Sequence, residues 1–230
     1  MSRTSTRNAA DIPMDELPVS GLLRSATSKA HESAETANFI GKLMRGQLSI
    51  EAWQLMLEQL DYVYRALETT ANEMRDGDQC AELLYTELDR ADSIEHDLRA
   101  LRVRTGVDPI GMLASTREYV DRILSCRNDG VRYVAHHYTR YLGDLSGGQV
   151  MRVKFKEHYG LQDDEATFFR FEHIDSGPRF KKRYREHLDA LDLDQAGRER
   201  IVEEANASFM CNQRIFEELD EIVTAQQRAA

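Results

Sequence analysis

The sequence predicts an all-α fold in a single domain of seven to eight helices. Apolar residues recur at spacings of three and four from about residue 19 to residue 225, and no stretch alternates with period two for more than a few residues. The 230 residues include only 4 Pro and 13 Gly, too few for the many turns of a β-sandwich or barrel. We therefore expect one helical domain over 19–225, a disordered N-terminal tail over 1–18 and a short C-terminal tail over 226–230.

The helices can be placed in order along the chain. The clearest is 49–74, where Trp53, Met56 and Leu57 begin an apolar face that continues at helical spacing. Ser49 suits its N-cap, and Glu51 lies in the first turn, where the helix dipole favours negative charge. The other predicted helices are 20–38, 80–101, 115–126, 131–159, 178–191 and 195–224. The breaks between helices fall at Gly41–Gly46, Asp76–Asp78, Gly106–Pro109, Asn128–Gly130, Gly160–Asp164 and Ser176–Pro178.

Charge and composition exclude several classes of protein. With 30 Lys and Arg against 40 Asp and Glu, the formal net charge is −10, which argues against a nucleic-acid or anionic-membrane binder. The longest stretch without these four residue types, Ala205–Gln213, is far shorter than the roughly 20 residues of a membrane helix. The three cysteines, Cys80, Cys126 and Cys211, are odd in number and widely spaced, which indicates reduced thiols rather than disulfides. We expect a cytoplasmic monomer; residues 2–8 resemble a transit peptide only faintly.

Several common site motifs are absent from the sequence. None of the seven histidines has Glu three residues before it, which excludes the ferritin-like di-iron pattern. The sequence also lacks HExxH, GxxxxGK[ST] and paired Cys ligands. The remaining candidates for a site are a glycine-interrupted helix, one histidine and one basic helix.

The glycine-interrupted helix covers residues 134–154. Gly143, Gly147 and Gly148 interrupt its apolar spacing, and each costs about 1 kcal/mol of helix propensity relative to alanine. One interpretation is a helix that stops at Gly147–Gly148 and restarts. The other is that a backbone without Cβ atoms kinks and approaches a large flat ligand, which Asp144 would also face, holding an ordered water. The spacing leaves both interpretations open.

The candidate histidine, His31, shares a helix face with Leu23 and Thr27, so its side chain is expected to point inward. Glu35 follows at i+4, in position to hydrogen-bond the second imidazole nitrogen, as partners of ligating histidines do. Arg24 lies two turns earlier on the same face. The alternative is a partly buried histidine satisfied by Glu35, which is the commoner situation.

The basic helix, 178–191, carries five cations in seven residues: Arg179, Lys181, Lys182, Arg183 and Arg185. Such a run is usually a solvated face, and the apolar stripe beneath it starts at Phe180 and Tyr184. Because Lys181 and Arg185 are four residues apart, one edge of the helix could also bind a pair of anionic groups.

Four segments together resemble one family. AHHYTRYLGDLSGGQV is similar to the distal-helix signature of the haem oxygenases. KAHESAE resembles the family's proximal-histidine stretch, FFRFEHIDSGPRFKKRYREHL its propionate-binding region and IVEEANASFMCNQRIFEEL its C-terminal helix. The similarity covers about residues 20–222 and looks closest to the soluble actinobacterial enzymes that degrade haem for iron. It implies haem held between a proximal helix and a glycine-kinked distal helix.

The resemblance also implies a role for each candidate residue. His31 would be the axial iron ligand, oriented by Glu35, and Gly143 and Gly147 would lie against the distal face of haem. Arg24 stands where many members carry Lys. Asp144 would organise distal water, and the residues in its hydrogen-bond network would be Tyr64 and Arg140. The residues at propionate-binding positions are Tyr138, Lys181 and Arg185.

The implied activity is oxidative cleavage of haem. Haem b would be both cofactor and substrate, O₂ the co-substrate, and a ferredoxin or reductase the electron donor. The products would be biliverdin, with the IXα isomer expected, CO and Fe²⁺. The alternatives are a non-enzymatic haem carrier or sensor, which has no need of proton delivery by Asp144, and a helical interaction module that binds no haem. The sequence does not identify the electron donor or the physiological purpose.

Overall fold

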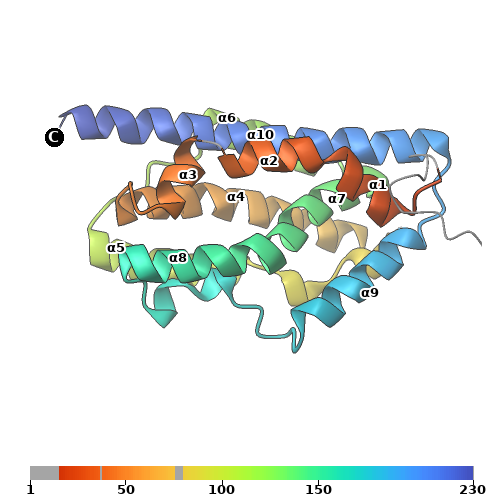
Figure 1. Ribbon diagram of the computed structural model, residues 1–230, viewed down its shortest axis with the longest axis horizontal. Helices are drawn as coiled ribbons and strands as arrows, with labels where there is room; N and C mark the ends of the chain where they lie inside the picture. Colours follow the sequence, from red (N-terminus) through yellow and green to blue (C-terminus); the bar gives the residue numbers. More distant parts are fainter. Residues whose placement is uncertain (1–15, 37, 76–79, 230) are drawn as a thin grey trace, which may run out of the picture.

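The computed structural model describes residues 16–36, 38–75 and 80–229, and these residues form helices and loops without a strand (Figure 1). The α-helices are α1 (Val19–Ala26), α2 (Ser28–Thr36), α3 (Asn38–Met44), α4 (Ile50–Met74), α5 (Ala91–Thr105), α6 (Ala114–Leu124), α7 (Gly130–His137), α8 (Gln149–Tyr159), α9 (Gly177–Asp189) and α10 (Gln195–Ala229). Two π-helical segments, Tyr138–Leu142 and Asp144–Gly148, join α7 to α8. The predicted all-α class is confirmed.

Helix α4 lies at the centre of the bundle, and α10 runs along one side of it (Figure 1). α4 packs on α5 and α6, while α10 packs on α6, α7, α2 and α3. The Trp53 side chain of α4 is fully buried, stacked on Phe169 with ring centroids 5.4 Å apart and edge-on to Phe155 at 5.0 Å. Because Phe155 belongs to α8 and Phe169 to the 3₁₀ turn Thr167–Phe169 that follows, this aromatic cluster fixes the glycine-rich helix against the centre of the fold.

Several predicted boundaries differ from the structure. The predicted helix over 20–38 is divided into α1 and α2 at Thr27, whose hydroxyl donates to the Leu23 carbonyl at 2.7 Å. Helix α5 begins only at Ala91, after short 3₁₀ turns at Ala81–Leu83 and Thr86–Leu88. At the C-terminus α10 continues to Ala229, so residues 226–229 are helical and not a tail. Most of the predicted N-terminal tail, 1–15, lies outside the described residues.

None of the helices in the described part of the chain combines the length and apolar character needed to cross a bilayer.

Candidate functional site

The glycine-rich segment continues as a helix from α7 through α8, without a stop. Gly143 has helical dihedral angles, φ −59° and ψ −50°, and the flanking residues are π-helical. The interpretation that the helix ends at Gly147–Gly148 is therefore wrong. π-Helical turns cost hydrogen-bond geometry and occur frequently at functional sites. We call the whole run from Gly130 to Tyr159 the distal rod.

One pocket, of about 580 Å³, brings together α1, α2, the distal rod, α9 and α10. Its size is within the usual range for small-molecule sites. Its lining residues are Arg24, Thr27, Ser28, His31, Tyr138, Thr139, Leu142, Gly143, Ser146, Gly147, Lys181, Arg185 and Phe209. Seven of these were singled out from the sequence: Arg24, His31, Tyr138, Gly143, Gly147, Lys181 and Arg185. Three separate stretches of sequence therefore converge on one cavity.

Gly143 and Gly147 form an open part of the pocket wall. A Cβ atom added at either residue would meet no atom within 4 Å, apart from its immediate helical surroundings. Neither has a positive φ, so the backbone conformation does not require glycine. Protein packing does not require it either. The remaining reason for glycine is the space itself, since a Cβ would project into room that a ligand lying on the backbone could use.

A larger side chain at Gly143 should therefore spare the fold but obstruct the pocket. We expect Gly143→Leu to keep or raise the melting temperature, because leucine gains up to about 1 kcal/mol of helix propensity over glycine. Affinity for hemin, the ligand that the sequence resemblance implies, should fall at least tenfold, because the leucine side chain occupies the ligand's space. Thermal unfolding without hemin and a hemin titration check the two halves. A large loss of stability would show that glycine is needed for packing.

His31 lies in α2 and reaches the pocket from the wall formed by the first two helices. Its side chain points inward as far as the cavity, which it lines, and it stays exposed there rather than entering the core. Its ring meets Phe209 of α10 edge-on, with centroids 5.8 Å apart. Glu35 is in the same helix, but its side chain lies outside the described residues, so its contact with His31 stays a prediction.

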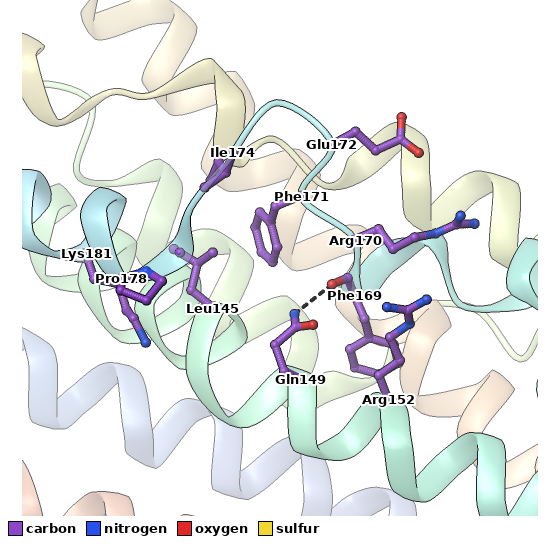
Figure 2. Close-up of a pocket in the computed structure, with 11 residues that line it drawn as sticks. Leu145, Gln149, Arg152, Phe169, Arg170, Phe171, Glu172, Ile174, Pro178 and Lys181 are labelled. Carbon is purple, nitrogen blue, oxygen red and sulfur yellow. Dashed lines mark hydrogen bonds between the residues drawn. The ribbon is translucent and has the colours of Figure 1, made fainter.

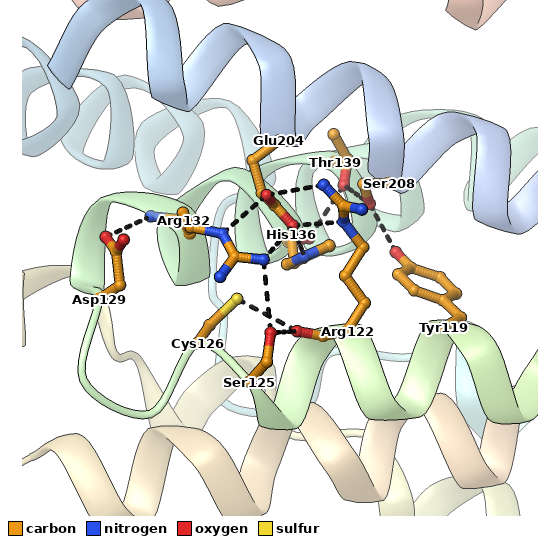
Figure 3. A network of polar contacts seen from close by, with 10 residues as sticks. All are labelled: Tyr119, Arg122, Ser125, Cys126, Asp129, Arg132, His136, Thr139, Glu204 and Ser208. Carbon is orange, nitrogen blue, oxygen red and sulfur yellow. Dashed lines mark hydrogen bonds and ion pairs between the residues drawn. The ribbon is translucent and has the colours of Figure 1, made fainter. Parts of the chain in front are cut away.

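Two histidines of the distal rod, His136 and His137, are not available as pocket ligands. His136 and His137 are 0% and 2% exposed, and neither lines the pocket. The His137 Nδ1 atom is hydrogen-bonded to the Tyr184 hydroxyl at 2.8 Å, and burial lowers the His137 pKa to about 3. His136 Nε2 lies 2.8 Å from the Glu204 carboxylate (Figure 3). Among the histidines near the cavity, the geometry favours His31.

Glu204 of α10 is a buried carboxylate at the centre of a polar network that joins α10 to α6 and α7 (Figure 3). Arg122 and Arg132 both donate to its carboxylate, with Nε–O distances of 2.6 and 2.8 Å. Burial opposes ionisation, but these hydrogen bonds and that of His136 hold the Glu204 pKa well below its usual range. Cys126 is close enough to complete a possible three-ligand metal cluster. Two guanidinium groups on the shared carboxylate disfavour a cation, so we assign the network a structural role.

Asp144, Tyr64 and Arg140 form a second polar group that does not line the pocket but adjoins its glycine wall. The Tyr64 hydroxyl donates to Asp144 Oδ2, and Arg140 Nη2 donates to the Tyr64 oxygen at 3.1 Å. Arg140 also donates to Asn212 Oδ1 of α10 at 2.8 Å and lies 4.0 Å from Asp144 Oδ1. The predicted association of Asp144 with Tyr64 and Arg140 is thus observed as contacts.

The net effect of burial and neighbouring charges is to shift the pKa values of Asp144 and Tyr64 in the same direction. Burial raises the Asp144 pKa, while the Arg140 charge and the Tyr64 hydrogen bond oppose that effect. Burial also raises the Tyr64 pKa well above its usual range, so its hydroxyl keeps its proton and donates. A carboxyl group with a raised pKa takes up a proton more readily than an exposed one.

The opposite edge of the pocket is cationic. Lys181 and Arg185 of α9 face the cavity with Arg24 of α1, and Lys181 Nζ donates to Ser146 Oγ at 3.0 Å. Burial raises the Tyr138 pKa, and the nearby charges of Arg185 and Arg24 partly oppose this. Several cavity or network residues were not predicted as site residues, because contacts between distant helices leave no local signal: Thr27, Ser28, Thr139, Leu142, Ser146, Phe209 and Asn212.

Comparisons with known proteins agree on one family. The family model described as "Heme oxygenase" matches residues 17–218. "Heme oxygenase 2" of Rattus norvegicus is 36% identical over 207 residues, which cover 88% of this chain and 66%, about two thirds, of the rat protein. "Heme oxygenase 1" of the cyanobacterium Synechocystis is 34% identical over 199 residues, covering 86% of this chain and 83% of that one.

A solved structure shows the same fold. The crystal structure of heme oxygenase-1 from Synechocystis in complex with heme superposes with a TM-score of 0.84 at 32% sequence identity. The match covers 93% of this chain and 97% of that one.

Proposed function

The chain belongs to the haem oxygenase family, and we propose that it binds haem b between α2 and the distal rod and cleaves it to biliverdin, CO and Fe²⁺. The observation that carries the proposal is the single pocket with His31 on one wall, Gly143 and Gly147 on another, and a cationic edge. Release of iron is the proposed purpose. The cytoplasmic location, the monomeric state and the similarity to actinobacterial enzymes stay predictions.

The pocket fits the chemistry of haem. Haem is a flat apolar macrocycle with iron at its centre and two carboxylates at one edge. The backbone surface at Gly143 and Gly147 carries no side chain and can accommodate a flat face. Apart from the helix's own backbone, no atom lies within 4 Å of the position that a Cβ would take at either residue. An imidazole suits iron, and Lys181, Arg185 and Arg24 suit carboxylates. These donor types match all three parts of the ligand.

The residues divide the work of the reaction. Bound haem supplies the iron that activates O₂ and the ring that is oxidised. His31 provides the neutral nitrogen ligand, and the cationic edge fixes how the ring is rotated in the pocket. Electrons come from a separate ferredoxin or reductase.

Asp144 acts as the proton-handling group. Its carboxylate adjoins the glycine wall, and Tyr64 and Arg140 hold it from behind. From there the Asp144 carboxyl group orients a water molecule toward the glycine wall of the pocket and exchanges a proton with that water. Tyr64 keeps its own proton. A proton-handling group is needed to open the haem ring but not to carry or sense haem. Its presence therefore favours an enzyme over a carrier or sensor.

Removal of the propionate anchors should scramble the site of cleavage. Charge-assisted contacts contribute about 1.5–3 kcal/mol each, enough to select one ring orientation. We expect biliverdin IXα from the native protein and a mixture of isomers from the Lys181→Ala/Arg185→Ala variant. The control is Arg179→Ala/Lys182→Ala, which removes two cations of α9 that do not line this pocket. Chromatography of the products decides; one unchanged isomer from the first variant would refute the anchoring role.

A further inference from the structure

A second pocket, of about 480 Å³, borders the distal rod and shares only Lys181 with the lining of the first pocket (Figure 2). Leu145 and Gln149 of the rod form one side, residues 169–174 the other, and the start of α9 closes one end (Figure 2). The Gln149 amide donates to the Phe169 carbonyl at 2.8 Å, which ties the two sides together. The cavity is large enough for a small organic molecule.

The middle of this second pocket is apolar. Leu145 and Phe169 are 8% and 1% exposed and belong to the core, and Phe171 and Ile174 pack against that core. In Figure 2 the Phe171 ring points from its loop toward the rod. Two phenyl rings and two aliphatic side chains thus line the space, a composition that favours a flat apolar body.

The charged residues of the second pocket are mostly cationic. Arg152, Arg170 and Lys181 line it against one carboxylate, Glu172, although the chain as a whole has a formal charge of −10. Arg152 and Arg170 each donate to Asp163 through Nη2, but their Nε atoms are buried and have no hydrogen-bond partner among the described residues. Buried donors without acceptors are costly, and a bound anion offers acceptors at this site.

We propose that the second pocket is a binding site for a flat aromatic or conjugated carboxylate. Its apolar body would lie among Leu145, Phe169 and Phe171, and its carboxylate would pair with Arg152 and Arg170 at one end of the pocket. Guanidinium groups bind carboxylates through paired hydrogen bonds, so the arginines give the site its preference for an anion over a neutral analogue.

Lys181 connects the two pockets. It lines both, and its ammonium group bonds Ser146, which lines the first. A carboxylate that draws Lys181 into the second pocket removes a cation from the first, so each ligand weakens binding of the other. This coupling rests on the proposed function, because it requires haem in the first pocket. The site itself does not.

The experiment is a titration of the full chain with 2-naphthoate, followed by the methyl NMR signals of Leu145 and Ile174, two residues of the second pocket. We expect both signals to shift together with one Kd. Arg152→Gln should raise that Kd about tenfold, the loss of one charge-assisted contact. The control, Lys154→Gln, removes the same charge from an α8 residue outside the pocket and should change Kd less than twofold.

Three results would overturn the site: no shift of the two methyl signals, equal Kd values in the two variants, or equally tight binding of the neutral 2-naphthamide. Zinc protoporphyrin, which carries the same propionates as haem, tests the coupling. With it bound, the Kd for 2-naphthoate should rise several-fold; an unchanged value would overturn the coupling. Failure of the porphyrin to bind would count against the proposed function, while the naphthoate shifts would still support the second site.

Discussion

Asp144→Ala should lower the rate of biliverdin formation by roughly 10²- to 10⁴-fold, the usual cost of losing a positioned proton-transfer group. Hemin affinity should stay nearly unchanged, because Asp144 does not line the pocket and holds neither iron nor propionate. The measurement is biliverdin formed per haem under air with an electron donor, beside a hemin titration of both proteins.

Asp144→Asn separates proton transfer from support of the wall. The amide oxygen can still accept the Tyr64 hydrogen bond, so the distal rod should keep its structure. An amide cannot exchange a proton as a carboxyl group does. We therefore expect Asp144→Asn to form biliverdin nearly as slowly as Asp144→Ala. Recovery of most of the native rate in Asp144→Asn would instead assign Asp144 a structural role.

His31→Ala should abolish the histidine-ligated spectrum of the hemin complex and, with it, turnover. The other walls of the pocket remain, so the variant should still bind hemin, but with lower affinity than the native protein. Imidazole added to the solution should fill the vacated space and restore ligation. His96→Ala, which removes an exposed histidine of α5 that does not line the pocket, is the matched control.

The spectrum of His31→Ala distinguishes His31 from two other candidate iron ligands, His136 and His137. His136 and His137 are buried and bonded to Glu204 and Tyr184, so neither can reach haem without unfolding part of the rod. An unchanged spectrum in His31→Ala would show that another residue is the ligand and would break the proximal assignment.

Much of the site could be predicted because its residues lie in short segments with strong local patterns. The glycines, Asp144 and Arg140 fall within one stretch, and helical spacing alone relates Lys181 to Arg185. Hydrophobic periodicity located α4 to within one residue of its observed bounds, Ile50–Met74, since the apolar residues at spacings of three and four are the ones that the fold buries.

The parts that could not be predicted depend on contacts between distant segments. Asn212 and Phe209 join the site because α10 packs on the distal rod, and no spacing within α10 indicates that neighbour. The π-helical turns add one residue per turn without a distinctive composition, so the sequence predicts only a helix with glycines. The division at Thr27 depends on a side-chain bond to a carbonyl that threonine makes in straight helices as well.

The most direct test of the central claim is a turnover of the native protein loaded with one equivalent of hemin, reduced under air and followed by absorption. If the pocket with His31, the glycine wall and Asp144 is a site of haem cleavage, the haem bands should disappear and biliverdin should form, with CO and iron released. Haem that binds through His31, is reduced and takes up O₂, but survives intact, would contradict the account and identify a carrier or sensor.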